Sequence, residues 1–187
     1  LMLLSNTQTL ITGVLGQSEG RYTNRLITLG SGQGTYDKTR LVPFGEYVPL
    51  ESLLRGLITF FDLPMSAIVP GGQQSLLTHG QIRIGALICY EIAYAGQARR
   101  VTEDANVILT VSNDTWFGDS IGPDQHLQIA QIRARELGKP VIRATNDGLT
   151  AFIDARGQIE HILPRFVSAV LSHTVIPATT VTPLSLI

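Results

Sequence analysis

The fold is indicated most clearly by the stretch Ile82-Arg83-Ile84-Gly85-Ala86-Leu87-Ile88-Cys89-Tyr90-Glu91. It contains the only cysteine of the 187-residue chain. The run from Ile82 to Ile88 predicts a strand, and residues 92–105 predict a helix after it. A strand followed at once by a helix projects its last side chain from the edge of a sheet. A thiol placed there is accessible to substrate and responds to nearby charges. The stretch therefore predicts a sheet with Cys89 at its rim.

Short apolar runs alternate with helical patterns through the middle of the chain. Residues 107–111 are typical of a buried parallel strand, and a polar and aromatic loop at 112–119 follows. Pro123 begins the clearest helix, which ends at Gly138. This alternation predicts an α/β fold with helices covering a mixed sheet. The other predicted elements are strands at 9–15 and 24–29 joined by a turn at 16–20, a turn at 30–34, a structured loop at 36–49, a helix at 49–61, a strand at 141–144, a hairpin of 149–153 and 158–163, and a strand at 167–176.

Composition excludes several classes of function. The net charge is −1, so no basic field attracts nucleic acid, and we expect no nucleic-acid partner. No stretch reaches the roughly 18 apolar residues of a spanning helix, because charges interrupt the longest patch, 50–63. A single cysteine forms no internal disulfide. There is no phosphate-binding loop and no metal-ligand spacing, so we expect neither a cofactor nor a metal.

Three side chains suggest nucleophilic chemistry, and each also has a simpler interpretation. Cys89 is either a small buried apolar residue or a nucleophile. Lys38 is either a solvated surface charge or a cation that stabilises a thiolate and an oxyanion. Glu46 is either a surface carboxylate or a group that fixes Lys38 or relays a proton.

The loop after the second predicted parallel strand carries further candidates. Trp116 is typical of packing, although polar neighbours such as Asn113 make a substrate-lining loop an alternative. His126 lies in the first turn of the predicted helix and is expected to be exposed. His79 precedes a glycine and is expected in a turn. Neither histidine has a partner at metal-ligand spacing.

Several motifs together resemble a known superfamily. The segments 36–38 and 43–49 resemble the lysine region of the nitrilase (carbon–nitrogen hydrolase) superfamily, and 89–91 resembles its nucleophile elbow. Residues 112–126 and 143–146 resemble, more narrowly, the apolipoprotein N-acyltransferase family, integral membrane enzymes that complete bacterial lipoproteins. The resemblance implies a nitrilase-like α-β-β-α sandwich, of which residues 1–187 would form a single partial catalytic domain.

The resemblance also implies a ping-pong acyl transfer. Cys89 would take an acyl chain from a phospholipid as a thioester, and the amine of a diacylglyceryl-cysteine on an apolipoprotein would then accept it. Lys38 would hold the oxyanion and Glu46 would support the lysine. The catalytic set is thus Cys89, Lys38 and Glu46, and the substrate-binding set is Tyr90, Glu91, Asn113 and Trp116.

One departure from the family affects the expected activity. The family's general base is a glutamate farther upstream of the lysine than this chain extends, and Glu19, the only glutamate before Lys38, matches no base motif. We therefore expect a fragment, inactive by itself, of an enzyme held in the bacterial inner membrane with its catalytic domain facing the periplasm. The segment Leu50–Phe61 is either a core helix or an apolar flap at the bilayer surface.

Two other functions remain open at this point. One is a soluble nitrilase-type amidase that passes the acyl group to water. The other is a non-catalytic domain that keeps the fold and binds lipid or a protein partner.

Overall fold

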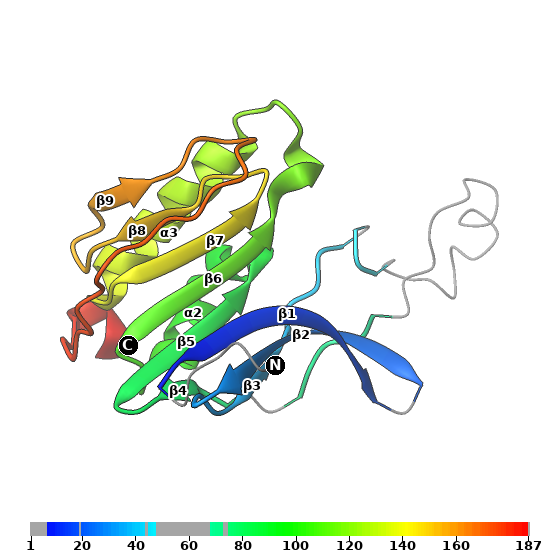
Figure 1. The fold of residues 1–187 in the computed structure, drawn as a ribbon, viewed down its shortest axis with the longest axis horizontal. Helices are drawn as coiled ribbons and strands as arrows, with labels where there is room; N and C mark the ends of the chain where they lie inside the picture. The colour runs from blue at the N-terminus through cyan, green and yellow to red at the C-terminus, as the bar shows by residue number, and fades with distance from the viewer. Residues whose placement is uncertain (1–6, 19, 44, 48–67, 73–74, 187) are drawn as a thin grey trace.

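The computed structural model describes residues 7–18, 20–43, 45–47, 68–72 and 75–186 (Figure 1). They form a six-stranded sheet in the order β4-β5-β6-β7-β8-β9 and a three-stranded sheet in the order β1-β2-β3. The strands are β1 Thr9–Ser18, β2 Arg21–Gly30, β3 Thr35–Asp37, β4 Leu77–His79, β5 Ile82–Ile88, β6 Val107–Asn113, β7 Val141–Asn146, β8 Ala151–Ile153 and β9 Ile159–Ile162. The helices are α2 Ala95–Thr102, α3 Gly122–Leu137 and three short 3-10 helices, Cys89–Ala93, Asp114–Phe117 and Pro183–Leu186.

Parallel pairing of β5, β6 and β7 forms the centre of the large sheet. Helix α2 connects β5 to β6 and α3 connects β6 to β7, and Figure 1 shows both on the same face of the sheet. The predicted α/β class, with helices on a mixed sheet, is confirmed. Parallel strands end at one edge, so residues that follow β5, β6 and β7 meet there. Cys89 follows β5, Asp114 follows β6 and Asp147 follows β7.

Apolar side chains between the sheet and the helices form the core. Leu87, Ile108 and Val141 from the central strands are buried together with Leu127 and Ala130 of α3. Burial contributes roughly 1.5–3 kcal/mol for each large aliphatic side chain, which makes this contact the main support of the sheet edge.

The small antiparallel sheet delivers the lysine loop to that edge. Strands β1 and β2 pair from Thr9↔Gly30 to Ser18↔Arg21, and β3 pairs with the middle of β2. A backbone bridge between Gln33 and Thr78, with N···O distances of 2.9 and 2.8 Å, joins the two sheets. Lys38 comes directly after β3, so this bridge fixes its loop relative to β5.

Most of the predicted elements are confirmed. The hairpins at 9–29 and 149–163 and the strands at 82–88, 107–111 and 141–144 are present. Helix α3 ends where Gly138 adopts a φ of 63°, the left-handed cap that glycine favours. Among the residues that the structure describes, no helix is both long and apolar enough to cross a membrane.

Four predictions need correction. Residues 167–176 are not a strand, because the chain after β9 forms no ladder and its apolar side chains Val170 and Ile176 are exposed. The predicted helix 92–105 is helical only over α2, since Cys89–Ala93 folds as a separate 3-10 turn.

Two predicted loops also overlap regular structure at their beginnings. The predicted structured loop at 36–49 begins inside β3, and the loop at 112–119 begins inside β6 and continues as a 3-10 helix. The predicted helix at 49–61, including the Leu50–Phe61 segment, lies outside the described residues.

The close approach of α2 to β5 at Gly85 gives a test of the packing. A Cβ at Gly85 would lie 2.6 Å from the carbonyl oxygen of Val101 and 2.7 Å from Cγ2 of Thr102. We expect Gly85→Ala to lower the free energy of unfolding by about 1–3 kcal/mol, measured by urea titration. The matched control is Gly96→Ala in α2, where the nearest atom is 3.7 Å away. An alanine there should be neutral or stabilising by up to about 1 kcal/mol, and equal effects at both positions would contradict the packing.

Candidate active site

Cys89 lies at the carboxyl end of β5 on a sharp backbone turn. Its side chain is partly exposed and its φ is 57°, a left-handed value that non-glycine residues adopt rarely. Hydrogen bonds fix the backbone immediately before and at Cys89. The N–H of Ile88 donates to Oε2 of Glu91 at 2.8 Å, and Nε2 of His126 lies 3.2 Å from the carbonyl oxygen of Cys89. The sulfur is therefore at the sheet rim, as the sequence predicts.

Glu91 connects this turn to the lysine loop. The side chain is completely buried, and Oε1 accepts hydrogen bonds from the backbone N–H groups of Thr39 and Arg40 at 2.8 and 2.9 Å. The hydroxyl of Thr39 donates to the same oxygen at 3.0 Å. Oε2 accepts from Ile88 N–H and from the hydroxyl of Tyr36, both at 2.8 Å. With five protein donors, this carboxylate joins residues beside Lys38 to residues beside Cys89.

The carboxylate of Glu91 also acts on Tyr36. Burial, followed by the charge of Glu91 and the hydrogen bond to it, raises the pKa of Tyr36 far above its ordinary value. The tyrosine therefore stays a hydrogen-bond donor over the whole physiological pH range.

Lys38 and Glu46 form an ion pair between a buried lysine and a partly exposed carboxylate. Nζ of Lys38 donates to Oε2 of Glu46 at 2.6 Å and to Oε1 at 2.8 Å, and only 1% of the lysine side chain is exposed. Asn24 and the N–H of Val42 donate to the same carboxylate at 2.6 and 2.8 Å. The interpretations of Lys38 and Glu46 as surface charges are therefore wrong, and Glu46 holds the lysine in place.

A second buried ionic group lies beside the elbow. Nη2 of Arg143 donates to Oδ2 of Asp114 at 2.7 Å, and Nδ1 of His126 lies 3.1 Å from Oδ1 of the same carboxylate. All three side chains are almost completely buried. They come from β7, from the turn after β6 and from α3, so the group connects three elements.

The pKa values in this group reflect competition between burial and charge. Burial by itself raises the pKa of Asp114, but hydrogen bonds from His126 and Ser112 and the charge of Arg143 outweigh it. The pKa of Asp114 thus lies below its ordinary value of 3.8. Burial lowers the pKa of Arg143, while the charges of Asp114 and of an ionised Cys89 act in the opposite direction.

The predicted substrate-binding residues fall into two groups. Tyr90, Asn113 and Trp116 lie at the rim with exposed side chains, and Trp116, at 80% exposure, is not the packing residue that its type suggests. Glu91 does not belong with them. Both of its oxygens accept hydrogen bonds from protein donors, and its side chain is buried in the interior and not at the rim with the other three.

Sequence reasoning missed the roles of Arg143, Asp114 and His126. The sequence predicts an exposed His126, yet this side chain is buried with both ring nitrogens engaged. One signal was available in the sequence. Arg143 interrupts the apolar strand 141–144, and a buried arginine needs a carboxylate partner from a neighbouring strand end.

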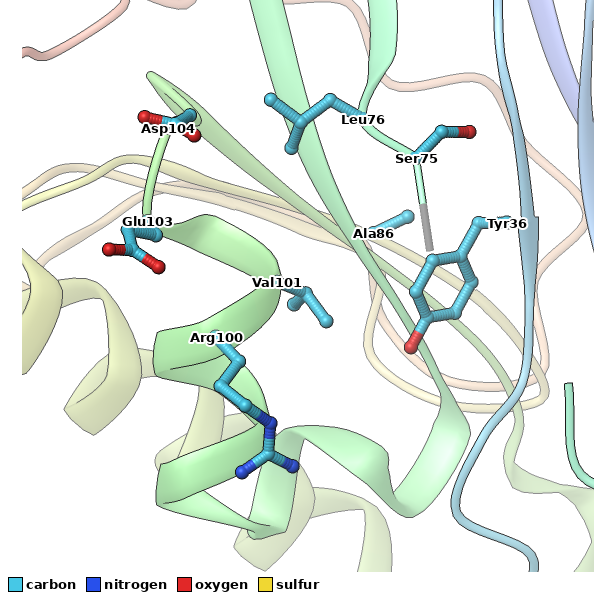
Figure 2. Close-up of a pocket in the computed structure, with 8 residues that line it drawn as sticks. All are labelled: Tyr36, Ser75, Leu76, Ala86, Arg100, Val101, Glu103 and Asp104. Carbon is cyan, nitrogen blue, oxygen red and sulfur yellow. The ribbon is translucent and has the colours of Figure 1, made fainter. Parts of the chain in front are cut away.

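A cavity of about 160 Å³ lies next to the Tyr36 side of the Glu91 network. Figure 2 shows Arg100 and Val101 of α2 on one side of it and Leu76 and Tyr36 on the other. Neither Cys89 nor Lys38 lines this cavity, so it is separate from the thiol site.

The fold and the site define an α/β protein with a cysteine elbow at a sheet edge, joined through a buried glutamate to a loop that carries a buried lysine paired with a second glutamate. The chain belongs to the carbon–nitrogen hydrolase family, which its residues 2–181 match.

Named relatives and solved structures agree with this family. The chain is 52% identical over 180 residues to an apolipoprotein N-acyltransferase of Pseudomonas aeruginosa, covering 93% of this chain and 35% of the relative. The enzyme of that name from Photobacterium profundum is 47% identical, with 96% of this chain and 37% of the relative covered. The chain thus spans about a third of the length of the curated relatives it matches.

Two solved structures show the fold. A mutant of the Nesterenkonia AN1 amidase from the nitrilase superfamily superposes with a TM-score of 0.61 at 19% identity, covering 84% of this chain and 57% of the amidase. A glutamine-dependent NAD+ synthetase of Acinetobacter baumannii gives 0.66 at 18% identity, covering 86% of this chain and 30% of the synthetase. The predicted nitrilase-like fold is therefore confirmed.

The five donors around Glu91 predict the effect of an isosteric change. In Glu91→Gln one carboxylate oxygen becomes an NH2 group, which donates and so cannot accept from the donors that face it. Each buried donor left without an acceptor costs about 1–3 kcal/mol. We expect the free energy of unfolding in urea to fall by at least that amount. Tyr36→Phe removes a single donor and should cost about 1 kcal/mol. A larger loss in Tyr36→Phe than in Glu91→Gln would contradict the network.

The lowered pKa of Asp114 predicts a pH dependence of stability. A carboxyl whose folded-state pKa is depressed stabilises the protein above its unfolded pKa, and this contribution is lost as the pH falls through the folded value. Asp114→Asn should cost on the order of 3 kcal/mol at pH 7, because it removes the charge partner of Arg143. It should also flatten the decline in the free energy of unfolding as the pH falls below about 4. Urea titrations across this pH range measure both effects. Parallel plots of unfolding free energy against pH for wild type and Asp114→Asn would contradict the lowered pKa of Asp114.

Proposed function

We propose that this chain is part of the catalytic domain of an apolipoprotein N-acyltransferase and that Cys89 carries the acyl group. The observation that carries the proposal is the partly exposed elbow of Cys89, tied through buried Glu91 to the loop that holds the Lys38–Glu46 pair. Identity of 47–52% over nearly the whole chain to proteins of that name supports the choice of reaction.

The proposed reaction has two balanced steps. The thiolate of Cys89 attacks an ester carbonyl of a phospholipid, a C–S bond forms, the ester C–O bond breaks, and the lysophospholipid leaves after taking up a proton. The α-amine of a diacylglyceryl-cysteine then attacks the thioester, an amide forms, the C–S bond breaks, and the amine loses a proton. The thiol is thereby regenerated.

The described side chains suit this chemistry. Lys38 carries a buried positive charge whose position Glu46 fixes, and a preorganised cation of this kind stabilises a developing oxyanion without reorganisation. Tyr90 packs edge to face on Tyr94 and stays exposed beside the thiol, so it forms one wall for substrate. Asn113 and Trp116 form the opposite rim in this proposal.

Exposed apolar side chains support a lipid substrate and a membrane location. Trp116 and Ile121 follow β6 at the same edge as Cys89, and both are mostly exposed. Arg165 donates to the carbonyl oxygen of Ser120 at 3.0 Å and so keeps the exposed Phe166 near this loop. A cluster of this composition marks an interaction with lipid or protein. We propose that this edge faces the periplasmic surface of the bacterial inner membrane.

The test uses the complete gene product, a phospholipid with a labelled sn-1 acyl chain, and a synthetic diacylated lipopeptide. We expect N-acylated peptide and a hydroxylamine-sensitive label on the peptide that contains Cys89, both read by mass spectrometry. Cys89→Ser should lose the adduct, because a serine hydroxyl is a far poorer nucleophile at neutral pH. Labelled fatty acid released without N-acylated peptide would indicate a hydrolase and reject the transferase.

The two lysines of the chain provide a matched control. Lys38→Met should reduce acyl transfer by at least about 100-fold, because it removes a preorganised charge at the oxyanion. Lys139→Met alters a lysine that is also buried, with Nζ 2.7 Å from the carbonyl oxygen of Thr102. Lys139 precedes β7 and so lies at the opposite edge of the parallel strands from Cys89. Its substitution should lower stability and spare acyl transfer in the folded protein.

A further inference from the structure

We propose that Arg143 and His126 form, with Asp114, a buried positioning network of net positive charge that favours the thiolate form of Cys89. The inference rests on the proposed function, because it assigns these residues to the nucleophile named there. It extends that function to side chains that do not contact substrate.

Hydrogen-bond geometry places a positive charge on His126. Nε2 lies 3.2 Å from the carbonyl oxygen of Cys89, which accepts and never donates, so Nε2 carries a hydrogen. Nδ1 lies 3.1 Å from Oδ1 of Asp114, and this carboxylate stays ionised beside the guanidinium of Arg143. Both ring nitrogens therefore face acceptors, which is the arrangement of an imidazolium.

Arg143 adds a second positive charge. Nη2 donates to Asp114 at 2.7 Å and Nε to the carbonyl oxygen of Leu149 at 3.2 Å, while Nη1 is buried without a hydrogen-bond partner among the described residues. The arginine side chain is 1% exposed. The group thus combines two cations with one carboxylate and keeps one unit of positive charge in the interior.

This charge lies against the residue that would carry the thiolate, because Nε2 of His126 lies 3.2 Å from the carbonyl oxygen of Cys89. The other charged groups around the elbow do not supply the same effect. Lys38 is paired with both oxygens of Glu46, and Glu91 is a carboxylate that opposes a second negative charge. The surplus positive charge of the network offsets that opposition.

The experiment measures the alkylation of Cys89 by iodoacetamide between pH 5 and pH 10 in the complete gene product. The peptide that contains Cys89 is quantified by mass spectrometry, so other thiols do not interfere. In Arg143→Met we expect the midpoint of the profile to move to higher pH by about one unit, and alkylation at pH 7 to be about tenfold slower. Arg143→Lys keeps the charge and should restore most of the rate.

A matched arginine separates charge from packing. Arg133 of α3 also supports the elbow, donating to the carbonyl oxygens of Ile92 and Ala93 at 3.0 and 3.2 Å, but its charge is paired with Glu136. Arg133→Met should lower thermal stability and leave the alkylation midpoint unchanged. A profile for Arg143→Met that coincides with wild type, or an equal shift in Arg133→Met, would overturn the proposal.

A second measurement applies if Arg143→Met does not fold. The ¹⁵N and ¹³C shifts of His126 in the unmodified protein at pH 8 report its charge, with the resonance assigned by its loss in His126→Gln. Imidazolium shifts support the network, and neutral imidazole shifts overturn it. Alkylation needs neither phospholipid nor lipopeptide. If the midpoint shift is found but acyl transfer is not, the proposed function fails while the network stands, and the reverse result rejects the network alone.

Discussion

The carboxylate of Glu91 is the constraint on which the site depends. It is completely buried, and its two oxygens accept from five donors, none of which carries a formal charge. An unpaired buried carboxylate would be strongly destabilising, so these donors must stay in place for the chain to fold. Three of them belong to Thr39 and Arg40, next to Lys38, and one belongs to Ile88, next to Cys89. The same carboxylate therefore fixes the loop that follows Lys38 relative to the turn at Cys89.

Two ionic groups flank the elbow, and they differ in charge balance. In the first, Lys38 and Glu46 neutralise each other through two short hydrogen bonds, so the lysine has a fixed position and a limited long-range field. In the second, one carboxylate, Asp114, faces both Arg143 and His126. Charge interactions are stronger in the interior than in water, so the unbalanced group keeps a net positive field around the elbow, whereas the opposite charges of the balanced pair largely cancel beyond a short distance.

The sequence predicts the parts of this structure that local pattern determines. Apolar periodicity identifies the parallel strands and α3, and the position of Cys89 at a strand end follows from them. Buried polar contacts are not local. His126 looks like a solvent-facing residue because only the docking of α3 against the elbow buries its ring. The run 167–176 looks like a strand because its composition is apolar, but a strand also needs a free edge to pair with, and sequence alone does not show which edges remain open.

Strained backbone conformations are concentrated near the sheet edge that carries Cys89. Among the described residues, the three non-glycine residues with positive φ are Cys89, Asp147 and Phe166, at 57°, 56° and 59°. Cys89 and Asp147 follow parallel strands at the same edge, and Arg165 beside Phe166 binds the loop at that edge. Such conformations cost of order 1 kcal/mol or more each and persist only where the surrounding contacts fix them. At Cys89, the hydrogen bonds of Glu91 to Ile88 N–H and of His126 to the Cys89 carbonyl oxygen provide that fixation. His126 thus couples the strained turn to the buried ionic group, because one ring nitrogen binds the Cys89 carbonyl oxygen and the other faces Asp114.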